Sequence, residues 1–456
     1  MGRLLSLAGA LALAFVLAWT AVQPPRAELA DAPAAAFSAG RAMTDVQVIA
    51  RSQHPTGSAA NAQVRDHLLT RLRNLGLATE IQTAEVAQSR AFEGDVMVSG
   101  ARIENVIGIL PGRDRSAAPL LIMSHYDSVP NSPGAADDAA GVAATLEALR
   151  ALRSAGAPRR DIVVLITDGE EIGLLGAKAF FERHPLARRV GLVINLEARG
   201  GGGRAQMFET GRQNGEVVEL LQRTAVSPSS SSLAVYLYEH MPNGTDFTEA
   251  LEAGKRGLNF AFIGRQFDYH SPTSTPANLD RGSLQDMGDQ LLSATRDAAY
   301  AQALPQAAAS KTYAQVAADV VLAYPPAAGF GVLLLAAALL AWGWRRASES
   351  GPLSWREAAR GALVGLYALL VAAALLRLAR KASGYGFGFI EQRGLLAQTD
   401  RWELALALVA LAALLWAAAV AHRGGRVAAA LLPLSAGASA SLIGGFDATG
   451  LGLGVA

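Results

Sequence analysis

The stretch DIVVLITDGEEIGLLGA, Asp161 to Ala177, contains a run of β-formers followed by a glycine and two adjacent glutamates. An unbroken apolar run of this length is typical of a buried strand, such as those of a parallel sheet. The residues after the turn predict a helix from about Gly173 to Arg183. Glu170 and Glu171 therefore stand at the carboxyl end of a strand. Adjacent side chains there point in different directions, so each glutamate is expected to have its own role.

Further strands and helices alternate on both sides of this stretch. Residues 104–128, ENVIGILPGRDRSAAPLLIMSHYDS, contain two β-runs joined by a Pro-Gly turn, which predicts a hairpin. Residues 137–156 carry apolar side chains at helical spacing, and residues 190–198 and 257–264 predict two more strands. The alternation predicts an α/β domain with a mixed, largely parallel central sheet flanked by helices. In such sheets the ligand site lies outside the carboxyl ends of the strands.

Acids and histidines follow four of the predicted strands where each one ends. Because these ends should converge on one rim, the unpaired carboxylates would repel one another unless cations were present. Histidine and carboxylate groups suit zinc, and the chain contains no cysteine. The residues are His125 and Asp127 after LLIMS, Glu170 and Glu171 after DIVVLIT, Glu197 after VGLVIN, and Asp268 to His270 after GLNFAFIG, with Asp137 and Asp138 in a Pro-Gly-Ala loop that enters a helix. Each of these residues, taken alone, could have a purely structural role. Packing gives no common reason for acids and histidines to follow four different strands.

Five motifs in this order resemble those of the co-catalytic two-zinc aminopeptidases, the family of bacterial leucyl aminopeptidase and aminopeptidase Y. They are HYDS, GAADDAAG, DGEEIGLLGA, NLEARG and DYHSPTST. Residues 54–76 and 195–211 are most similar to the membrane-bound endoplasmic-reticulum metallopeptidase branch. The resemblance covers residues 41–300 and implies a zinc-dependent aminopeptidase, a hydrolase that acts on peptide or protein N-termini with water activated by two zinc ions.

The resemblance also implies a role for each site residue. The metal ligands would be His125 and Glu197 on one zinc ion, Glu171 and His270 on the other, and Asp137 bridging both. Glu170 would be the general base that takes a proton from the attacking water. Tyr269 would hydrogen-bond the developing oxyanion, and Asp127 would orient His125. Many soluble family members carry aspartate at the position of Glu197.

Other polar residues receive structural interpretations. Asp138 is expected to be an N-terminal helix residue. Residues 200–203 are a run of glycines and are expected to form a flexible loop near the site. Asp246 has two open interpretations, a turn residue or an acid of the pocket. Residues 227–243 are expected to be a loop that contributes to specificity. Five histidines without suitable acidic companions are expected to be structural or at the surface: His54, His67, His184, His240 and His422.

Apolar segments flank the predicted peptidase domain of residues 24–311. Residues 4–22 have spanning length and follow Arg3, which predicts a membrane anchor, with a cleaved signal peptide as the alternative for residues 1–23. Residues 312–456 predict a multi-spanning region with about four helices, at 320–342, 362–376, 404–421 and 427–443. Arginines beside these runs place the peptidase domain on the outer, periplasmic or lumenal-equivalent, side, although basic residues between 377 and 401 disagree with that topology.

Several other functions remain open. Glutaminyl cyclisation with a single zinc ion is one alternative, and a non-catalytic binding or membrane-assembly protein is another. A transporter is less favoured because the apolar runs contain almost no ionisable residues away from their ends. The net charge of +1 gives no reason to expect nucleic acid as a partner, so peptide and membrane lipid are the expected partners.

Overall fold

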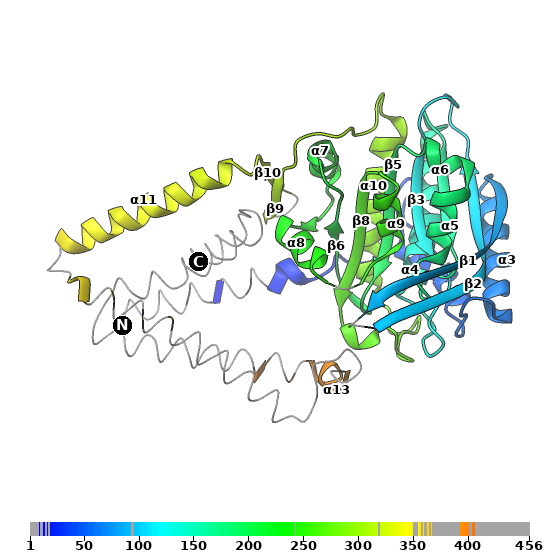
Figure 1. The fold of residues 1–456 in the computed structure, drawn as a ribbon, viewed down its shortest axis with the longest axis horizontal. Coiled ribbons are helices and arrows are strands. Elements are labelled where there is room, and N and C mark those ends of the chain that lie inside the picture. The colour runs from blue at the N-terminus through cyan, green and yellow to red at the C-terminus, as the bar shows by residue number, and fades with distance from the viewer. Residues whose placement is uncertain are drawn as a thin grey trace. The chain divides into compact units, whose positions relative to one another are not determined.

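The computed structural model describes residues 19–349 apart from 93–94, 242 and 318–319, with scattered residues between 9 and 16 and between 354 and 405. Within these residues, eight strands form one mixed sheet in the order β1-β2-β4-β3-β5-β8-β6-β7 (Figure 1). The parallel neighbours at its centre are β4 (Ile162–Thr167), β3 (Leu120–His125), β5 (Leu192–Ala198) and β8 (Gly257–Gly264). The predicted mixed, largely parallel sheet is therefore confirmed.

Antiparallel strands extend the sheet at both edges. One edge carries the long hairpin of β1 (Ala78–Phe92) and β2 (Asp95–Leu110), and the other carries β6 (Gly202–Glu209) and the short β7 (Ser229–Ser230). The predicted hairpin within residues 104–128 is wrong, because β2 pairs with β1 on one side and with β4 on the other. Both edges of β2 are occupied, so β3 lies beyond β4.

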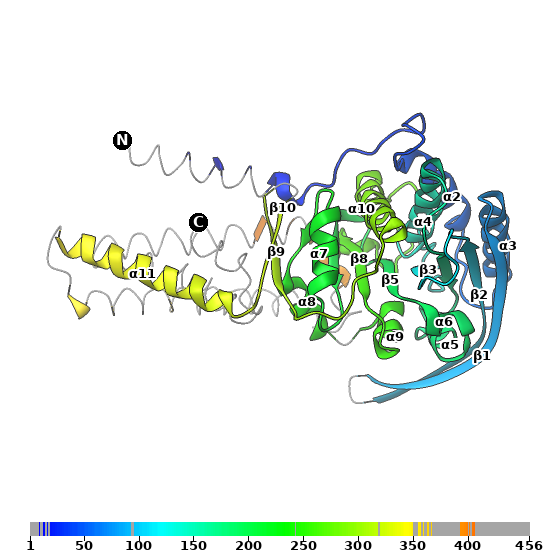
Figure 2. The same ribbon diagram turned by 90° about the horizontal axis from the view of Figure 1, so that it is seen from above.

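Helices cover both faces of the sheet (Figure 2). One layer contains α2 (Ala39–Ile49), α3 (Ala59–Asn74), α4 (Ala139–Leu152), α7 (Gly215–Thr224) and α10 (Arg281–Tyr300). The opposite layer contains α5 (Leu175–Arg183), α6 (Pro185–Arg189) and α9 (Asp246–Glu252). Because the central strands are covered on both faces, they are largely apolar, and β3, β4 and β5 are buried at every residue.

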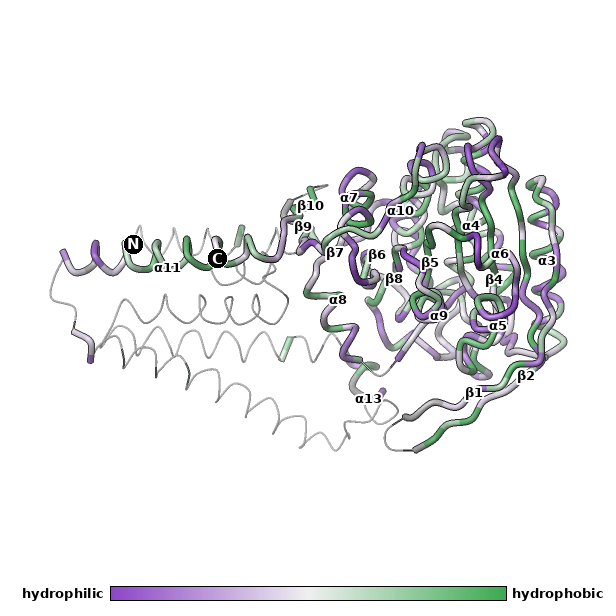
Figure 3. The backbone as a smooth tube through the Cα atoms, turned by 45° about the horizontal axis from the view of Figure 1, so that its top comes forward, coloured by the Kyte–Doolittle hydropathy of each residue, from purple (hydrophilic) through white to green (hydrophobic). Residues whose placement is uncertain are grey.

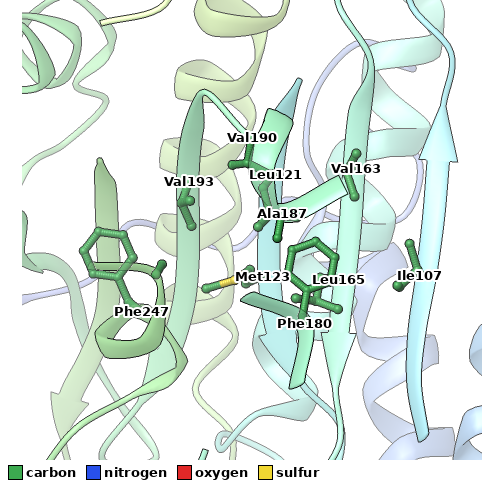
Figure 4. Packing of buried hydrophobic residues seen from close by; sticks show 11 residues of the cluster. Ile107, Leu121, Met123, Val163, Leu165, Phe180, Ala187, Val190, Val193 and Phe247 are labelled. Atoms are coloured by element: carbon green, nitrogen blue, oxygen red, sulfur yellow. The ribbon is translucent and has the colours of Figure 1, made fainter. Parts of the chain in front are cut away.

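The core on the α5 and α9 side is built from alternate residues of neighbouring strands (Figure 4). Leu121 and Met123 of β3 and Val163 of β4 pack against Phe180 of α5 and Phe247 of α9, all fully buried. Burying one such side chain contributes about 1.5–3 kcal/mol relative to leaving it exposed. This packing fixes the strand ends from which the candidate site is built.

The apolar helix α11 (Ala328–Glu349) lies in a second compact unit of the chain. Residues Ala328–Arg346 are long and apolar enough to cross a membrane (Figure 3), and most of them are exposed. The prediction of a span from residue 320 is wrong at its start, since β10 (Val320–Tyr324) pairs with β9 (Thr312–Ala317). Pro325 and Pro326 separate β10 from α11, as expected of residues that lack a backbone donor. The other predicted spans lie largely or wholly outside the described residues.

Candidate metal centre

The carboxyl ends of the central parallel strands meet at one rim, where the predicted ligands come together. His125 ends β3, and the register places it beside Thr167, the last residue of β4. The other predicted ligands lie at the ends of neighbouring elements. They are Glu171 in the turn after β4, Glu197 near the end of β5, His270 after the 3-10 turn that follows β8, and Asp137 just before α4. Four chain segments that are distant in sequence therefore contribute to one cluster.

Asp137 stands between the two histidines and presents one oxygen to each. Its Oδ1 lies 3.0 Å from Nε2 of His125, and its Oδ2 lies 3.2 Å from Nε2 of His270. Oε2 of Glu197 is 3.8 Å from the same nitrogen of His125. Oε2 of Glu171 is 2.8 Å from that of His270. The cluster thus has two halves, each with one histidine and one glutamate, and Asp137 is shared between them.

The histidine nitrogens have the arrangement that metal ligands require. Nδ1 of His125 lies 3.0 Å from the carbonyl oxygen of Asp127, which places the proton there and leaves the lone pair of Nε2 toward the cluster. Nε2 of His270 is buried and has no partner of hydrogen-bond geometry among the described residues, although two carboxylate oxygens lie within ion-pair distance. Two imidazole nitrogens that converge with carboxylate oxygens form a donor set that fits a bound cation.

The electrostatics of the cluster also fit cations. Burial raises the pKa of Glu171 to about 7, and Asp137 adds to this by repulsion. Burial raises the pKa of Glu197 well above its usual range, with further repulsion from Glu170. Burial lowers the pKa of His270, but Asp137 and Glu171 outweigh it and raise the value to about 10. The site therefore attracts positive charge, and the residues present fit a pair of metal ions with nitrogen and oxygen ligands.

Asp127 has a wider role in this structure than the predicted orientation of His125. Its carbonyl oxygen accepts the hydrogen bond from Nδ1 of that histidine, and its carboxylate Oδ1 lies 3.5 Å from the same nitrogen. The carboxylate accepts from the backbone N–H groups of Glu170 at 3.1 Å and Glu171 at 3.2 Å, and from Oγ1 of Thr56 at 3.2 Å. Asp127 therefore fixes the backbone of both glutamates. No local sequence pattern indicates this contact, because it joins residues more than 40 positions apart.

The two adjacent glutamates occupy a tight turn, and their environments differ. The carbonyl oxygen of Glu170 accepts from the backbone N–H groups of Gly173 and Leu174, both at 2.9 Å, which closes the turn. The carboxylate of Glu171 faces His270. Burial raises the pKa of the Glu170 carboxyl well above its usual range, and Glu171 and Asp246 raise it further. A carboxyl group with a raised pKa beside a metal site is typical of acid–base chemistry.

Tyr269 lies directly against the cluster. Its ring stacks on that of His270 with centroids 3.7 Å apart and an interplanar angle of 20°. The guanidinium of Arg199 lies 5.6 Å from the centre of the tyrosine ring, and its Nη1 donates to Oδ1 of Asn243 at 3.0 Å. Sequence reasoning did not single out Arg199, although it directly follows the NLEA segment.

Asp246 is an acid of the site region rather than a solvated turn residue. It begins α9 and is 1% exposed, and one of its oxygens accepts a hydrogen bond from Oγ1 of Thr167. Its other oxygen has no hydrogen-bond partner within the described part of the chain. Burial raises the pKa of Asp246 to about 7. Its negative charge also helps to raise the pKa of Glu170.

Other residues have the structural roles that were predicted for them. Asp138 is the N-cap of α4 and accepts from the backbone N–H of Gly141. Among the described histidines outside the cluster, His54 is buried and bonded to Ser52, His67 pairs with Asp45, His184 pairs with Glu80, and His240 is exposed. His422 lies outside the described residues.

Two predicted loops are instead regular structure. Gly202 and Gly203 begin β6, so residues 200–203 are not simply a flexible loop. A side chain at Gly200 would overlap the backbone of Gly264, and Gly203 has φ of +90°, so the glycines permit close packing at this strand end. Residues 227–243 contain β7 and the helix α8 (Ser232–Glu239). Local glycine and serine content misled the prediction in both places.

Comparison with known proteins identifies the domain that carries this site. Residues 105–295 match Peptidase family M28, and they form a domain of that family. Endoplasmic reticulum metallopeptidase 1 of Mus musculus is 32% identical over 261 residues, which cover 56% of this chain and 29% of the mouse protein. A vacuolar membrane protease of Candida dubliniensis is 34% identical over 248 residues, which cover 53% of this chain and 26% of the yeast protein.

A solved structure resembles the described chain at lower identity. The zinc aminopeptidase BSAP from Bacillus subtilis is 16% identical, with a TM-score of 0.48, over 62% of this chain and 98% of the bacterial one. The chain spans less than a third of the length of the curated relatives given above.

Proposed function

We propose that the chain is a membrane-anchored zinc peptidase that releases residues from the N-termini of peptides or proteins. The observation that carries this proposal is the position of Asp137, whose two oxygens face two separate histidine–glutamate pairs. The match of residues 105–295 to Peptidase family M28 supports the reaction class, and the names of the curated relatives support a metallopeptidase.

Two zinc ions are the proposed cofactors. His125 and Glu197 would hold one, Glu171 and His270 the other, and Asp137 both. When bound, they supply Lewis acidity, which polarises the scissile carbonyl and makes water more nucleophilic at neutral pH. Nitrogen and carboxylate ligands without thiolates are typical of catalytic rather than structural zinc sites.

Glu170 is the proposed general base. Its carboxylate would take a proton from the attacking water and deliver it to the departing nitrogen as the peptide bond breaks. The raised pKa of Glu170, caused first by burial, suits a group that must both accept and donate a proton near neutral pH. The bonds from Asp127 to the backbone of Glu170 and Glu171 hold this base in place.

Tyr269 is the proposed oxyanion donor. Its ring stacks on His270, so its hydroxyl is carried by a side chain that cannot rotate freely beside the metal cluster. A hydroxyl there would donate to the carbonyl oxygen as negative charge develops on it. Arg199 lies over the same ring and would add positive charge.

A buried acceptor in the site region favours substrates with a free amino terminus. Asp246 is 1% exposed, and one of its oxygens has no hydrogen-bond partner among the described residues. A protonated α-amine could donate a hydrogen bond to this oxygen, whereas an ionised substrate carboxylate has no hydrogen to donate. This supports release of N-terminal residues over C-terminal ones.

Membrane attachment is proposed from the apolar segments. Residues Ala328–Arg346 meet the length and composition of a span, and residues 4–22 form a second apolar run. Arg3, Arg345 and Arg346 flank these segments, and by the positive-inside rule they support a peptidase domain on the outer, periplasmic or lumenal-equivalent, side. The name of the vacuolar membrane protease among the relatives supports attachment to a membrane.

A metal count on the purified chain, combined with a panel of aminoacyl reporter substrates and peptides that begin with glutamine, tests the proposal. We expect two zinc ions per chain and release of N-terminal residues. One zinc ion with cyclisation of N-terminal glutamine would replace the proposal by a glutaminyl cyclase. Absence of both metal binding and turnover would indicate a binding protein.

A further inference from the structure

A row of buried polar side chains crosses the sheet beside Glu197. Asn195 of β5, Asn259 of β8 and Glu209 at the end of β6 are register partners on three adjacent strands. Both asparagines are fully buried, and Glu209 is 7% exposed. Amide groups in an apolar sheet interior destabilise the fold unless they are hydrogen-bonded, so the partners of this row carry information about its purpose.

The row is connected from end to end by hydrogen bonds that lead to the candidate metal centre. Nδ2 of Asn195 donates to Oε1 of Glu197 at 3.3 Å and to Oδ1 of Asn259 at 3.0 Å. Nδ2 of Asn259 donates to Oε2 of Glu209 at 2.8 Å and to Oγ1 of Thr245 at 2.9 Å. The chain of bonds therefore runs from Glu209 through two amides to Glu197.

Glu209 fixes the direction of every bond in the row. A carboxylate only accepts hydrogen bonds, so it requires the NH₂ side of Asn259, whose carbonyl oxygen must then face Asn195. That oxygen in turn requires the NH₂ side of Asn195, which is the side that reaches Glu197. Burial raises the pKa of Glu209 to about 7, but a protonated carboxyl group still has an acceptor oxygen for Asn259. The observed direction of the bonds is therefore compatible with both protonation states of Glu209, and the ionised state requires it.

The consequence for Glu197 is that its two oxygens are no longer equivalent. Oε1 accepts from Asn195, while Oε2 is the oxygen near His125 in the cluster. We propose that Asn195, Asn259 and Glu209 are positioning residues that hold Glu197 so that it offers one oxygen, Oε2, to the metal position that it shares with His125. This proposal rests on the proposed function, because it assigns a partner to one of its ligands.

A structural role alone would predict something different. If the row only stabilised the sheet, its loss would lower the melting temperature and leave the affinity of the folded protein for metal unchanged. A positioning role predicts unequal effects on the two metal positions, because the row reaches Glu197 and not Glu171. Hydrogen-bond partners of metal ligands typically change metal affinity about 10- to 100-fold when removed.

The test compares the full-length chain with Asn259→Leu, Glu209→Leu and Glu209→Gln. Gln290→Leu in α10 is the matched control, because it also removes a buried amide, one bonded to Ala205 and away from the cluster. Each metal-free protein is titrated with zinc against a chromophoric chelator, and its melting temperature is measured without metal. We expect Asn259→Leu and Glu209→Leu to weaken one zinc position about 10- to 100-fold and the other less than about threefold.

Glu209→Gln keeps an acceptor for Asn259 and is expected to retain both affinities. Gln290→Leu should lower the melting temperature without changing either affinity. If Asn259→Leu does not fold, Asn195→Ala, which deletes only the amide beside Glu197, carries the same expectation. Wild-type affinities at both positions in folded Asn259→Leu or Asn195→Ala would overturn the positioning role. A wild-type chain that binds no zinc would instead remove the proposed function on which it rests.

Discussion

Replacing Asp137 with alanine tests whether one carboxylate serves both halves of the candidate metal centre. Each half contains three donors, one histidine nitrogen, one glutamate oxygen and one oxygen of Asp137. Zinc binding to four-ligand protein sites is worth about 10–16 kcal/mol, or about 3 kcal/mol for each ligand. At about 1.4 kcal/mol for each factor of ten, losing one ligand weakens a position about 100-fold. Because Asp137 contributes to both, both positions should weaken together.

The assay is a zinc titration of the metal-free protein against a competing chelator, supported by elemental analysis. The metal-free variant should melt lower than the metal-free wild type, because Asp137 pairs with both His125 and His270. The folded fraction is therefore measured by circular dichroism before each titration. This distinguishes loss of a ligand from loss of the fold.

Asp138→Ala is the matched control because it makes the same chemical change one residue away. Asp138 caps α4 and also accepts from the backbone N–H of His125 at 3.3 Å, so its loss should destabilise the fold by about 1 kcal/mol and weaken zinc binding less than the loss of Asp137. If Asp137→Ala loses only one metal, the carboxylate is not shared. If it binds two at wild-type affinity, Asp137 is not a ligand and the interpretation of the cluster is wrong.

Three other predictions concern the base, the metals and the core. Glu170→Gln should keep both zinc ions but lower kcat about 100- to 10,000-fold, measured with an aminoacyl reporter; near-normal turnover would exclude Glu170 as the base. Removing the metals with a chelator should lower the melting temperature by at least about 8 °C. The reason is that one site stabilises the folded state by about 4 kcal/mol when the free zinc concentration is 1,000 times its Kd. An unchanged melting temperature would argue against bound metal. Gly288→Ala should destabilise the fold by about 1–2 kcal/mol in chemical denaturation, because the new methyl group overlaps the Phe37 ring, and the smaller side chain of Phe37→Leu should reduce that penalty in the double variant.

The central strands and the cluster could be predicted because their signals are local. An apolar run that ends in an acid or a histidine marks both a buried strand and its carboxyl end, and parallel strands bring such ends together. The five predicted ligands accordingly lie within one cluster in the structure. Their roles as ligands remain predictions that the metal titrations test.

The remaining features depend on partners that are distant in sequence. A Pro-Gly turn between two β-runs is compatible with a hairpin and with a strand that crosses to a more distant position, and here β4 lies between β2 and β3. The bonds from Asp127 to the glutamate backbone and the row from Glu209 to Glu197 join different strands and turns. No spacing within a single segment encodes these contacts.

The double attachment of Asp127 affects how its variants can be interpreted. One residue holds the Nδ1 side of His125 through its carbonyl oxygen and the Glu170–Glu171 backbone through its carboxylate. A substitution keeps the carbonyl but removes the carboxylate, which holds the turn after β4 and also lies 3.5 Å from Nδ1 of His125. Slow turnover in such a variant would therefore report a displaced base and a displaced ligand at once, and crystallography or metal titration would be required to separate them.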